Sequence, residues 1–258
     1  GVEDVMKMQL DLKSLAAETF VPLLLKALDA VREELSELEK RAAKLLAGWD
    51  YVMAVDRPEP AIYAYWLKEF YEALWEDEYE AAGIDGFFMP LEVVERIIRG
   101  ELAEPGRFER WTDAPLGELA LSSLRSALSK LTEDAGSDDP IEWRWGDVHV
   151  YAFDHPLGEA LPWLNYPRYP APGGFYTVNV APGLEVKNGP SIRYVADLSP
   201  GGTGYLALPG GNSGHPLSRH YLDQLEMWVN GGYKPLVMPS TPEGLEGGRV
   251  LILAPRGG

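Results

Sequence analysis

Residues 133–153, "EDAGSDDPIEWRWGDVHVYAF", mark the place where the chain changes from helical to strand-like patterning. Before this stretch, apolar residues recur at the three- and four-residue spacing of amphipathic helices. After it the residues alternate, with Val148, Val150 and Ala152 on one face of an expected strand. The change predicts an α+β fold with a helical first half and mainly antiparallel strands in the second half.

The first half is predicted to be mostly helical. The spacing predicts helices over residues 5–46, 61–80, 91–99 and 117–130. Pro22 is expected near a helix start, where its missing N–H costs no hydrogen bond. The second of these helices carries one apolar stripe, formed by Ile62, Trp66, Phe70 and Leu74.

The second half contains three further strand candidates, separated by Pro and Gly clusters. They are "FYTVNVA" (175–181), "SIRYVADL" (191–198) and "TGYLALPG" (203–210). A last helix is predicted over residues 219–230, ended by Gly231 and Gly232.

Composition excludes several classes of function. The formal net charge is −17, and residues 1–139 carry 30 acidic and 15 basic side chains, against 10 and 8 in residues 140–258. Phosphate binding needs clustered Lys and Arg, so neither a nucleic acid nor an anionic membrane is expected as a partner. The chain has no cysteine, which excludes disulfides, thiolate zinc sites and a cysteine nucleophile. Its beginning lacks a signal-peptide pattern and its apolar runs are short, so a soluble chain is expected.

Two histidines suggest a metal site. His149 and His155 are six residues apart, so one extended strand would place both on one face near Asp147. Zinc or copper could use such an arrangement, but Pro156 interrupts the strand and no third ligand has suitable local spacing. A hydrogen-bonded structural histidine is favoured over a metal ligand.

The loop at residues 209–220, "PGGNSGHPLSRH", mixes residues that occur in catalytic loops. Ser213, His215 and Asp223 lie too close in sequence for the usual hydrolytic triad, and there is no G-x-S-x-G motif. No G-K-S/T follows the glycines, as a phosphate loop would require. We interpret the segment as a connection from a strand to a helix, with Ser218 capping a helix that begins near Arg219.

An aromatic loop at residues 161–176 leaves two alternatives open. Trp163, Tyr166 and Tyr169 lie among prolines and could line an apolar pocket. A loop packed over the sheet explains them equally well. The acidic runs lack the spacing of a calcium-binding EF-hand loop and are interpreted as solvated helix faces.

Several segments, in the same order, resemble the penicillin acylase family of N-terminal-nucleophile amide hydrolases. This family includes penicillin, cephalosporin and acyl-homoserine-lactone acylases. The similarity extends from Glu3 to about Val237 and is carried by "EDVMKMQLDLKSLAAETFVPLLLKAL", "LAGWDYVM", "AIYAYWLKEF", "WRWGDVHVYAFDHPLG", "PGGFYTVNVA", "GPSIRYVADLS" and "GGNSGHPLSRHYLDQLEMWVNGGYKPL".

The resemblance is to the C-terminal part of the family's β chain. It implies a four-layer αββα fold, in which a serine freed by autoproteolysis begins the β chain and its own amino group is the general base. It also implies an oxyanion hole of backbone N–H groups and an asparagine. Gly1 has no side chain and cannot be that nucleophile, and Pro190 stands where some cephalosporin acylases have a supporting glutamate.

The resemblance therefore assigns no catalytic, cofactor-binding or metal-binding residue to this chain, and calcium is left to the complete enzyme. It does identify polar residues of a scaffold motif near the pocket, namely Asn212, Ser213, His215, His155 and Asn179. Residues 1–139 are expected to cover the pocket, and residues 140–258 to form part of the sandwich core.

The expected function is hydrolysis of an amide between an apolar acyl group and an amine through an acyl-enzyme. The expected partners are the α chain, the N-terminal part of the β chain and a small acylated amine, and the resemblance implies a periplasmic or extracellular location. The isolated chain is expected to be inactive. The alternatives are a non-enzymatic module that binds an acyl chain or glycan through residues 163–176, and a structural assembly domain.

Overall fold

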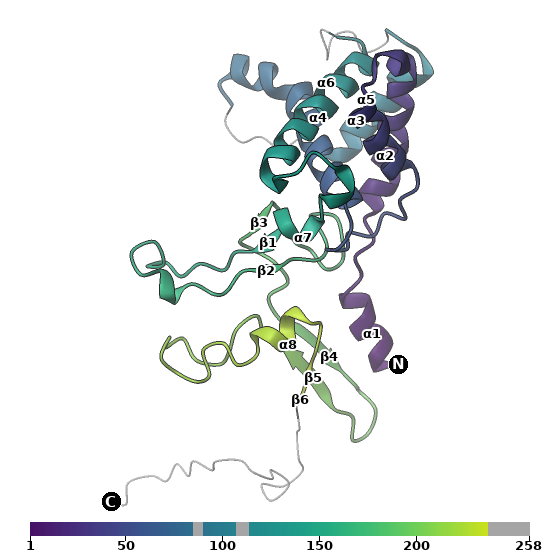
Figure 1. The fold of residues 1–258 in the computed structure, drawn as a ribbon. Coiled ribbons are helices and arrows are strands. Elements are labelled where there is room, and N and C mark those ends of the chain that lie inside the picture. Colours follow the sequence, from purple (N-terminus) through teal and green to yellow (C-terminus); the bar gives the residue numbers. More distant parts are fainter. Residues whose placement is uncertain (85–89, 107–113, 237–258) are drawn as a thin grey trace, which may run out of the picture. The chain divides into compact units, whose positions relative to one another are not determined.

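The computed structural model describes residues 1–84, 90–106 and 114–236 and divides the chain into two compact units (Figure 1). The larger unit is Met8–Pro190, and the smaller one combines Gly1–Lys7 with the described residues from Ser191 onward. Each unit contains one small sheet. The α+β class is confirmed. The functional division between residues 1–139 and 140–258 stays a prediction.

The helices of the chain precede most of its strands. The helical segments are α1 (Val2–Gln9), α2 (Leu15–Leu28), η1 (Asp29–Glu34), α3 (Glu37–Ala47), α4 (Glu59–Ala82), α5 (Leu91–Ala103), α6 (Leu116–Ala135), η2 (Pro140–Glu142), α7 (Trp145–Val148), η3 (Pro162–Leu164) and α8 (Leu225–Val229). The strands are β1 (Val150–Tyr151), β2 (Tyr169–Pro170), β3 (Glu185–Val186), β4 (Arg193–Ala196), β5 (Gly204–Ala207) and β6 (Lys234–Leu236).

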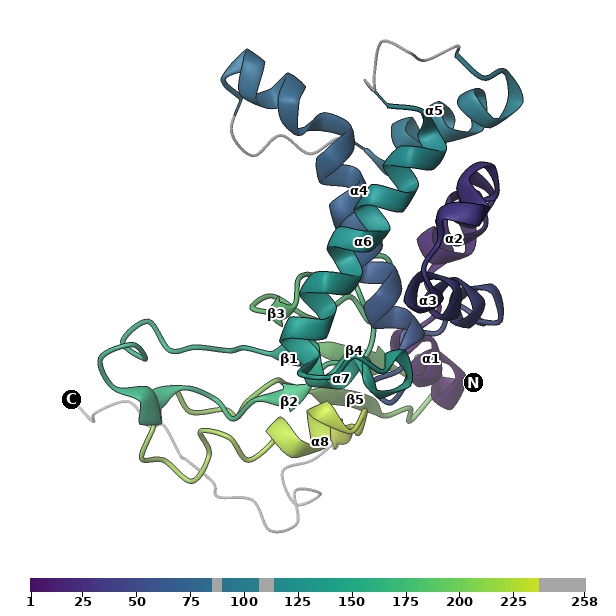
Figure 2. The same ribbon diagram turned by 45° about the horizontal axis from the view of Figure 1, so that its top comes forward.

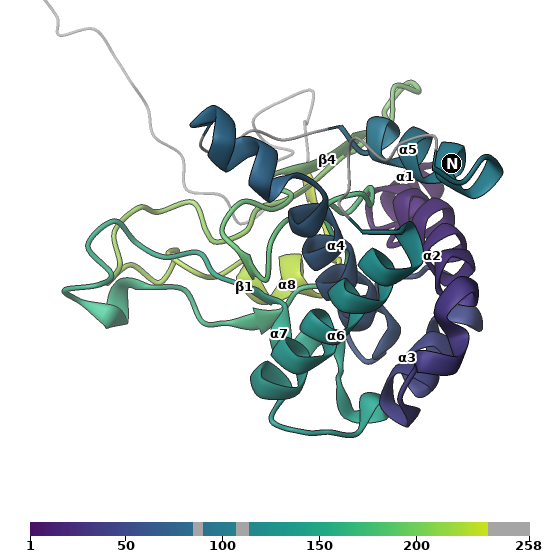
Figure 3. The same cartoon turned by 90° about the horizontal axis from the view of Figure 1, so that it is seen from above.

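The long helices α4 and α6 pack side by side in the core of the larger unit (Figure 2). The Trp66 indole nitrogen donates to the Ala120 carbonyl at 3.0 Å, and the predicted α4 stripe is buried, with each of its four residues at most 1% exposed. The helices α2 and α3 lie against this pair (Figure 3). The helices predicted at 61–80, 91–99 and 117–130 are therefore confirmed as α4, α5 and α6, each slightly longer than expected.

The single helix predicted over residues 5–46 is wrong. The chain leaves helical geometry before Ser14, where Lys13 forms a β-bridge with Val52 and the Ser14 hydroxyl caps α2. It breaks again before α3, where Ser36 and Glu39 form a reciprocal capping box. Pro22 lies inside α2 and not near its start. Apolar spacing continues from α2 through η1 to α3 because these three segments bury their apolar faces in the same core.

The sheet of the larger unit is small and mixed. Its order is β2-β1-β3, with β1 antiparallel to β2 and parallel to β3. The strand expected over residues 148–152 is correct only for Val150–Tyr151, because Val148 ends the short helix α7. The backbone N–H of Ala152 still donates to the Val186 carbonyl at 3.0 Å, beyond the end of the strand.

The smaller unit is built on an antiparallel sheet of order β4-β5-β6. Val195 pairs with Tyr205, which in turn pairs with Pro235. The strands predicted at 191–198 and 203–210 are confirmed as β4 and β5. The helix predicted over residues 219–230 is helical only in α8, because tight turns occupy the preceding residues.

A search of the described residues for a helix both long and apolar enough to cross a membrane finds none.

Candidate functional site

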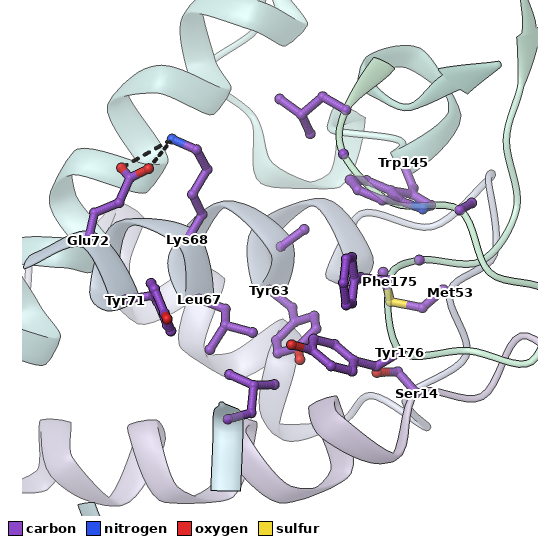
Figure 4. A pocket seen from close by; sticks show the side chains of 16 residues that line it. Ser14, Met53, Tyr63, Leu67, Lys68, Tyr71, Glu72, Trp145, Phe175 and Tyr176 are labelled. Carbon is purple, nitrogen blue, oxygen red and sulfur yellow. Dashed lines mark hydrogen bonds and ion pairs between the residues drawn. The ribbon is translucent and has the colours of Figure 1, made fainter. Parts of the chain in front are cut away.

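The larger unit contains an apolar cavity of about 370 Å³ beside α4 (Figure 4). Its lining comes from α4, from the start of α5, from α7, from the loop of residues 174–184, and from Ser14 and Met53. Much of the wall is aliphatic or aromatic, with Leu67, Leu91 and Leu184 as aliphatic members and Trp145, Phe175 and Tyr176 as aromatic ones. We call this space the α4 cavity.

The helical repeat of α4 explains how one element serves both the core and the cavity. Residues three or four positions apart lie on the same helix face. The stripe beginning at Ile62 is buried in the core. A second face points to the cavity, and it is formed by Ala64, Leu67, Lys68, Tyr71 and Glu72.

The loop opposite α4 is irregular and is held by specific hydrogen bonds. The Thr177 hydroxyl accepts from the Gly174 N–H at 3.0 Å and donates to the Asn179 carbonyl at 2.8 Å. Gly173 has a φ of +93°, and a Cβ there would lie 2.2 Å from the Asn179 carbonyl oxygen. The strand predicted over residues 175–181 is therefore wrong, because this backbone bonds within its own loop and to Asp11 and forms no ladder.

Trp145 forms a rigid part of the cavity wall. Its indole nitrogen donates to the Gly173 carbonyl at 2.9 Å, which ties α7 to the loop. Behind it, the fully buried His149 ring stacks on the indole with a centroid distance of 4.0 Å. The two ring nitrogens of His149 lie 2.6 Å from the Ala171 carbonyl oxygen and 3.0 Å from that of Ala181.

His149 thus acts as a structural histidine, because backbone carbonyls occupy both of its nitrogens. Burial lowers its pKa, and the neighbouring carbonyl groups oppose that effect only in part. His155 is also engaged, since its Nδ1 accepts from the Leu157 N–H at 3.0 Å. The described residues bring together no group of three or more Asp, Glu, His or Cys side chains that could hold a metal ion.

The α4 cavity has few polar groups. At its edge, Lys68 and Glu72 form an ion pair of 3.0 Å between side chains that are each about half exposed. Deep in the wall, Tyr63 is only 4% exposed, and its hydroxyl has no hydrogen-bond partner of acceptable geometry, although the Ser14 hydroxyl is close enough to influence it. Burial raises the pKa of Tyr63 well above its ordinary value, so the phenol is neutral and keeps its proton.

The polar residues of the predicted scaffold motif lie in three places. Asn179 belongs to the cavity loop, where its Nδ2 donates to the Pro172 carbonyl at 3.0 Å. His155 adjoins Asn165, whose Oδ1 accepts its backbone N–H at 3.0 Å. Asn212, Ser213 and His215 share one loop of the smaller unit.

The loop around Ser213 is held together internally. The Ser213 hydroxyl accepts from the His215 N–H at 3.2 Å, and the His215 Nδ1 accepts from the Leu217 N–H at 3.2 Å. Asn212 Oδ1 accepts from Gln224 at 3.0 Å. Asp223 pairs with His220 at 2.7 Å and not with His215. The Ser213, His215 and Asp223 side chains are thus not arranged as a triad.

The connection between β5 and α8 is longer than expected. The Ser218 hydroxyl accepts from the His220 N–H at 3.2 Å inside a turn, and α8 begins only at Leu225. The prediction that Ser218 caps a helix beginning near Arg219 is therefore wrong. The backbone in between is tied back to the glycine turn, since the Gln224 N–H donates to the Gly210 carbonyl at 2.8 Å.

Sequence reasoning missed the main components of the α4 cavity. Tyr63 and Trp145 were not singled out, although both are aromatic residues in segments that carry the family resemblance. The α4 side of the cavity could have been found from the sequence, because the residues of its second face recur at helical spacing. The loop of residues 174–184 offered no such signal.

The family model of penicillin amidase matches residues 1–242 of this chain. The chain belongs to the penicillin amidase family. The resemblance inferred from the sequence is thereby confirmed.

The relatives are acylases, and each is much longer than this chain. Acyl-homoserine lactone acylase QuiP of Pseudomonas fluorescens (strain Pf0-1) is 24% identical over 238 residues, covering 85% of this chain but 28% of that protein. Penicillin acylase 2 proenzyme of Pseudomonas sp. (strain SE83) is 35% identical over 103 residues, covering 36% of this chain and 13% of that protein. The chain thus spans about a quarter of the length of the first of these relatives.

A solved structure shows a similar fold. The thermostable penicillin G acylase of Alcaligenes faecalis matches with a TM-score of 0.59 and 18% identity. The match covers 100% of this chain and 50% of that chain. At this level of identity the match shows a shared fold.

Proposed function

We propose that this chain works as part of a longer amide hydrolase, which cleaves the amide between an apolar acyl group and an amine through an acyl-enzyme. The family match over residues 1–242 carries the proposal. The names of the relatives, acyl-homoserine lactone acylase and penicillin acylase, agree with this reaction class.

The nucleophile is proposed to lie outside this chain. A serine nucleophile needs a base within hydrogen-bond reach. Ser213 was the serine of the candidate triad, but its hydroxyl accepts a backbone N–H and His215 is engaged by Leu217. The family resemblance supplies the alternative, a serine that begins the β chain and uses its own amino group as base. On this proposal the Ser213 loop is a scaffold.

The contribution of this chain to substrate binding is proposed to be the α4 cavity. Ligand pockets are concave and mostly apolar, with volumes of about 300–1,000 Å³. The α4 cavity, at about 370 Å³, is at the small end of that range, and its walls are aliphatic and aromatic. Such a space suits the apolar part of an acyl group and offers little to a charged one.

Calcium, if the complete enzyme uses it, is proposed to be bound outside this chain. The described residues bring together no set of acidic side chains that fits a calcium ion, which needs six to eight oxygen ligands.

The non-enzymatic alternative receives no specific support. Trp163 is 61% exposed, and Tyr166 packs edge-on against Phe153. Neither of these residues lines the α4 cavity, and the segment of residues 163–176 reaches that cavity only at its end, through Phe175 and Tyr176.

The test is turnover of a chromogenic phenylacetyl amide by the complete protein and by the 258-residue chain alone. We expect the complete protein to release the amine and the chain alone to release none. If the complete protein leaves the amide intact, the proposed reaction is wrong. If the chain alone hydrolyses it, the nucleophile lies within the chain, and Ser213→Ala and His215→Ala then show whether the loop supplies it.

A further inference from the structure

Two of the five asparagines of the chain are followed directly by glycine, at Asn188–Gly189 and Asn230–Gly231. Asparagine is a thermolabile residue, because the backbone nitrogen of the next residue can attack its side-chain amide carbon and expel ammonia. This closes a succinimide ring, which water then opens to aspartate or isoaspartate. Glycine favours ring closure, because it has no Cβ to hinder the attacking nitrogen and its backbone is conformationally free.

The pair at Asn230 is held at both reacting groups. Asn230 ends α8, and its side-chain Nδ2 donates to the Glu226 carbonyl oxygen at 2.8 Å. The attacking atom is also engaged, since the Gly231 N–H donates to the Trp228 carbonyl oxygen at 3.1 Å. Ring closure at Asn230 therefore requires two hydrogen bonds to break at the end of α8.

The pair at Asn188 is held at neither reacting group. It lies in a bend after β3, outside the ladder that β3 forms with β1. Within the described residues, neither the Asn188 side chain nor the Gly189 N–H has a hydrogen-bond partner. Asn188 is also exposed, so water can reach a ring that forms there. The fold thus restrains one Asn-Gly pair and leaves the other free to react.

We propose that Asn188 is a site of spontaneous deamidation, which proceeds through a succinimide with the Gly189 nitrogen and gives aspartate and isoaspartate. The reaction consumes one water molecule and releases one ammonia molecule, with no change of oxidation state. Both products add one negative charge, and isoaspartate also adds one carbon atom to the backbone. This change lies next to the end of the larger unit at Pro190. It does not depend on the proposed amide hydrolysis.

The test is incubation of the 258-residue chain at mildly alkaline pH, followed by peptide mapping under acidic conditions that stop further reaction. Mass spectrometry measures deamidation of the peptides that contain Asn188 and Asn230, and methylation by an isoaspartyl methyltransferase measures the isoaspartate. Because two hydrogen bonds protect Asn230, we expect the rate at Asn188 to be at least about tenfold higher. In urea, where neither pair is restrained, the two rates should become similar.

Two variants test the chemistry. Gly189→Ala keeps the asparagine but places a Cβ beside the attacking nitrogen, so deamidation at Asn188 should slow severalfold in the folded chain and in urea. The fold should tolerate this Cβ, because its nearest neighbours, on Tyr151 and Val186, are 3.5 Å away. Asn188→Gln should leave this position intact over the same period, because glutamine must close a larger and less favoured ring.

Equal rates at Asn188 and Asn230 in the folded chain would overturn the inference. So would an Asn188 that stays intact in the folded chain over a period in which the chain in urea reacts. Deamidation that Gly189→Ala leaves unchanged would rule out the succinimide route. Amide turnover by the complete protein is a separate measurement, and neither of its results alters this one.

Discussion

The same substitution at two positions of α4 should change stability in opposite directions. Tyr63 and Tyr65 are 4% and 5% exposed, and replacing either by phenylalanine removes only one oxygen atom. Tyr65 donates its hydroxyl to Asp134 at 2.6 Å, whereas the Tyr63 hydroxyl has only the nearby Ser14 hydroxyl, with which it makes no hydrogen bond of good geometry. The pair therefore separates the value of a hydrogen bond from the cost of a missing one.

The magnitudes follow from these two environments. Hydrogen bonds to charged groups contribute about 1.5–3 kcal/mol. Because Asp134 is exposed, water can replace the lost donor in Tyr65→Phe, so this variant should lose about 1–2 kcal/mol of unfolding free energy. Leaving a buried hydroxyl unsatisfied costs about 1–3 kcal/mol. Relaxation and the lost contacts of the oxygen atom reduce that gain, so Tyr63→Phe should raise the unfolding free energy by about 1 kcal/mol.

The assay is urea denaturation of the chain and both variants, with the midpoint and the slope fitted separately. An unchanged slope shows that stability, and not the compactness of either state, has changed. If Tyr63→Phe loses as much stability as Tyr65→Phe, the Tyr63 hydroxyl has a partner in solution and the reasoning is refuted.

Three further outcomes are expected. Glu69→Gln should cost about 1–2 kcal/mol at pH 7, because the Glu69 carboxylate accepts from Lys130 at 2.6 Å. Burial opposes the charge of Glu69, but Lys130 and the other donors hold its pKa below the usual value. The stability lost in Glu69→Gln should therefore disappear on acidification below the ordinary pKa of 4.5. A loss of unfolding free energy that is the same at every pH would contradict this. Gly173→Ala should destabilise the chain by more than about 2 kcal/mol, since the added Cβ would meet the Asn179 carbonyl oxygen 2.2 Å away; an unchanged midpoint of urea unfolding would contradict this. Burial lowers the pKa of His149, so the unfolded chain takes up a proton at a higher pH than the folded chain does. The unfolding free energy should therefore fall as the pH drops below about 6.5, and it should fall less in His149→Gln. An equal loss of unfolding free energy between pH 7 and pH 5 in the chain and in the variant, measured in urea, would contradict this.

The sequence by itself determined the α+β class, the family and the positions of the helices α4, α5 and α6. The helix α4 is the clearest example, because Trp66 and the residues of its stripe repeat at the spacing that one buried face requires. The break before α3 was also encoded, in the Ser36 and Glu39 capping box, but the continuous apolar spacing concealed it.

Only the tertiary structure decided the cavity and the loops around it. Residues 175–181 alternate like a strand, yet Thr177 and Gly173 hold them in a loop whose partners come from distant segments. Residues 219–224 suggest helix, but their backbone is drawn into turns with the glycine loop. The α4 cavity exists because α4, α7 and this loop meet without filling the space between them. Local patterning records which side a residue buries, but it does not record where buried surfaces from separate segments fail to touch.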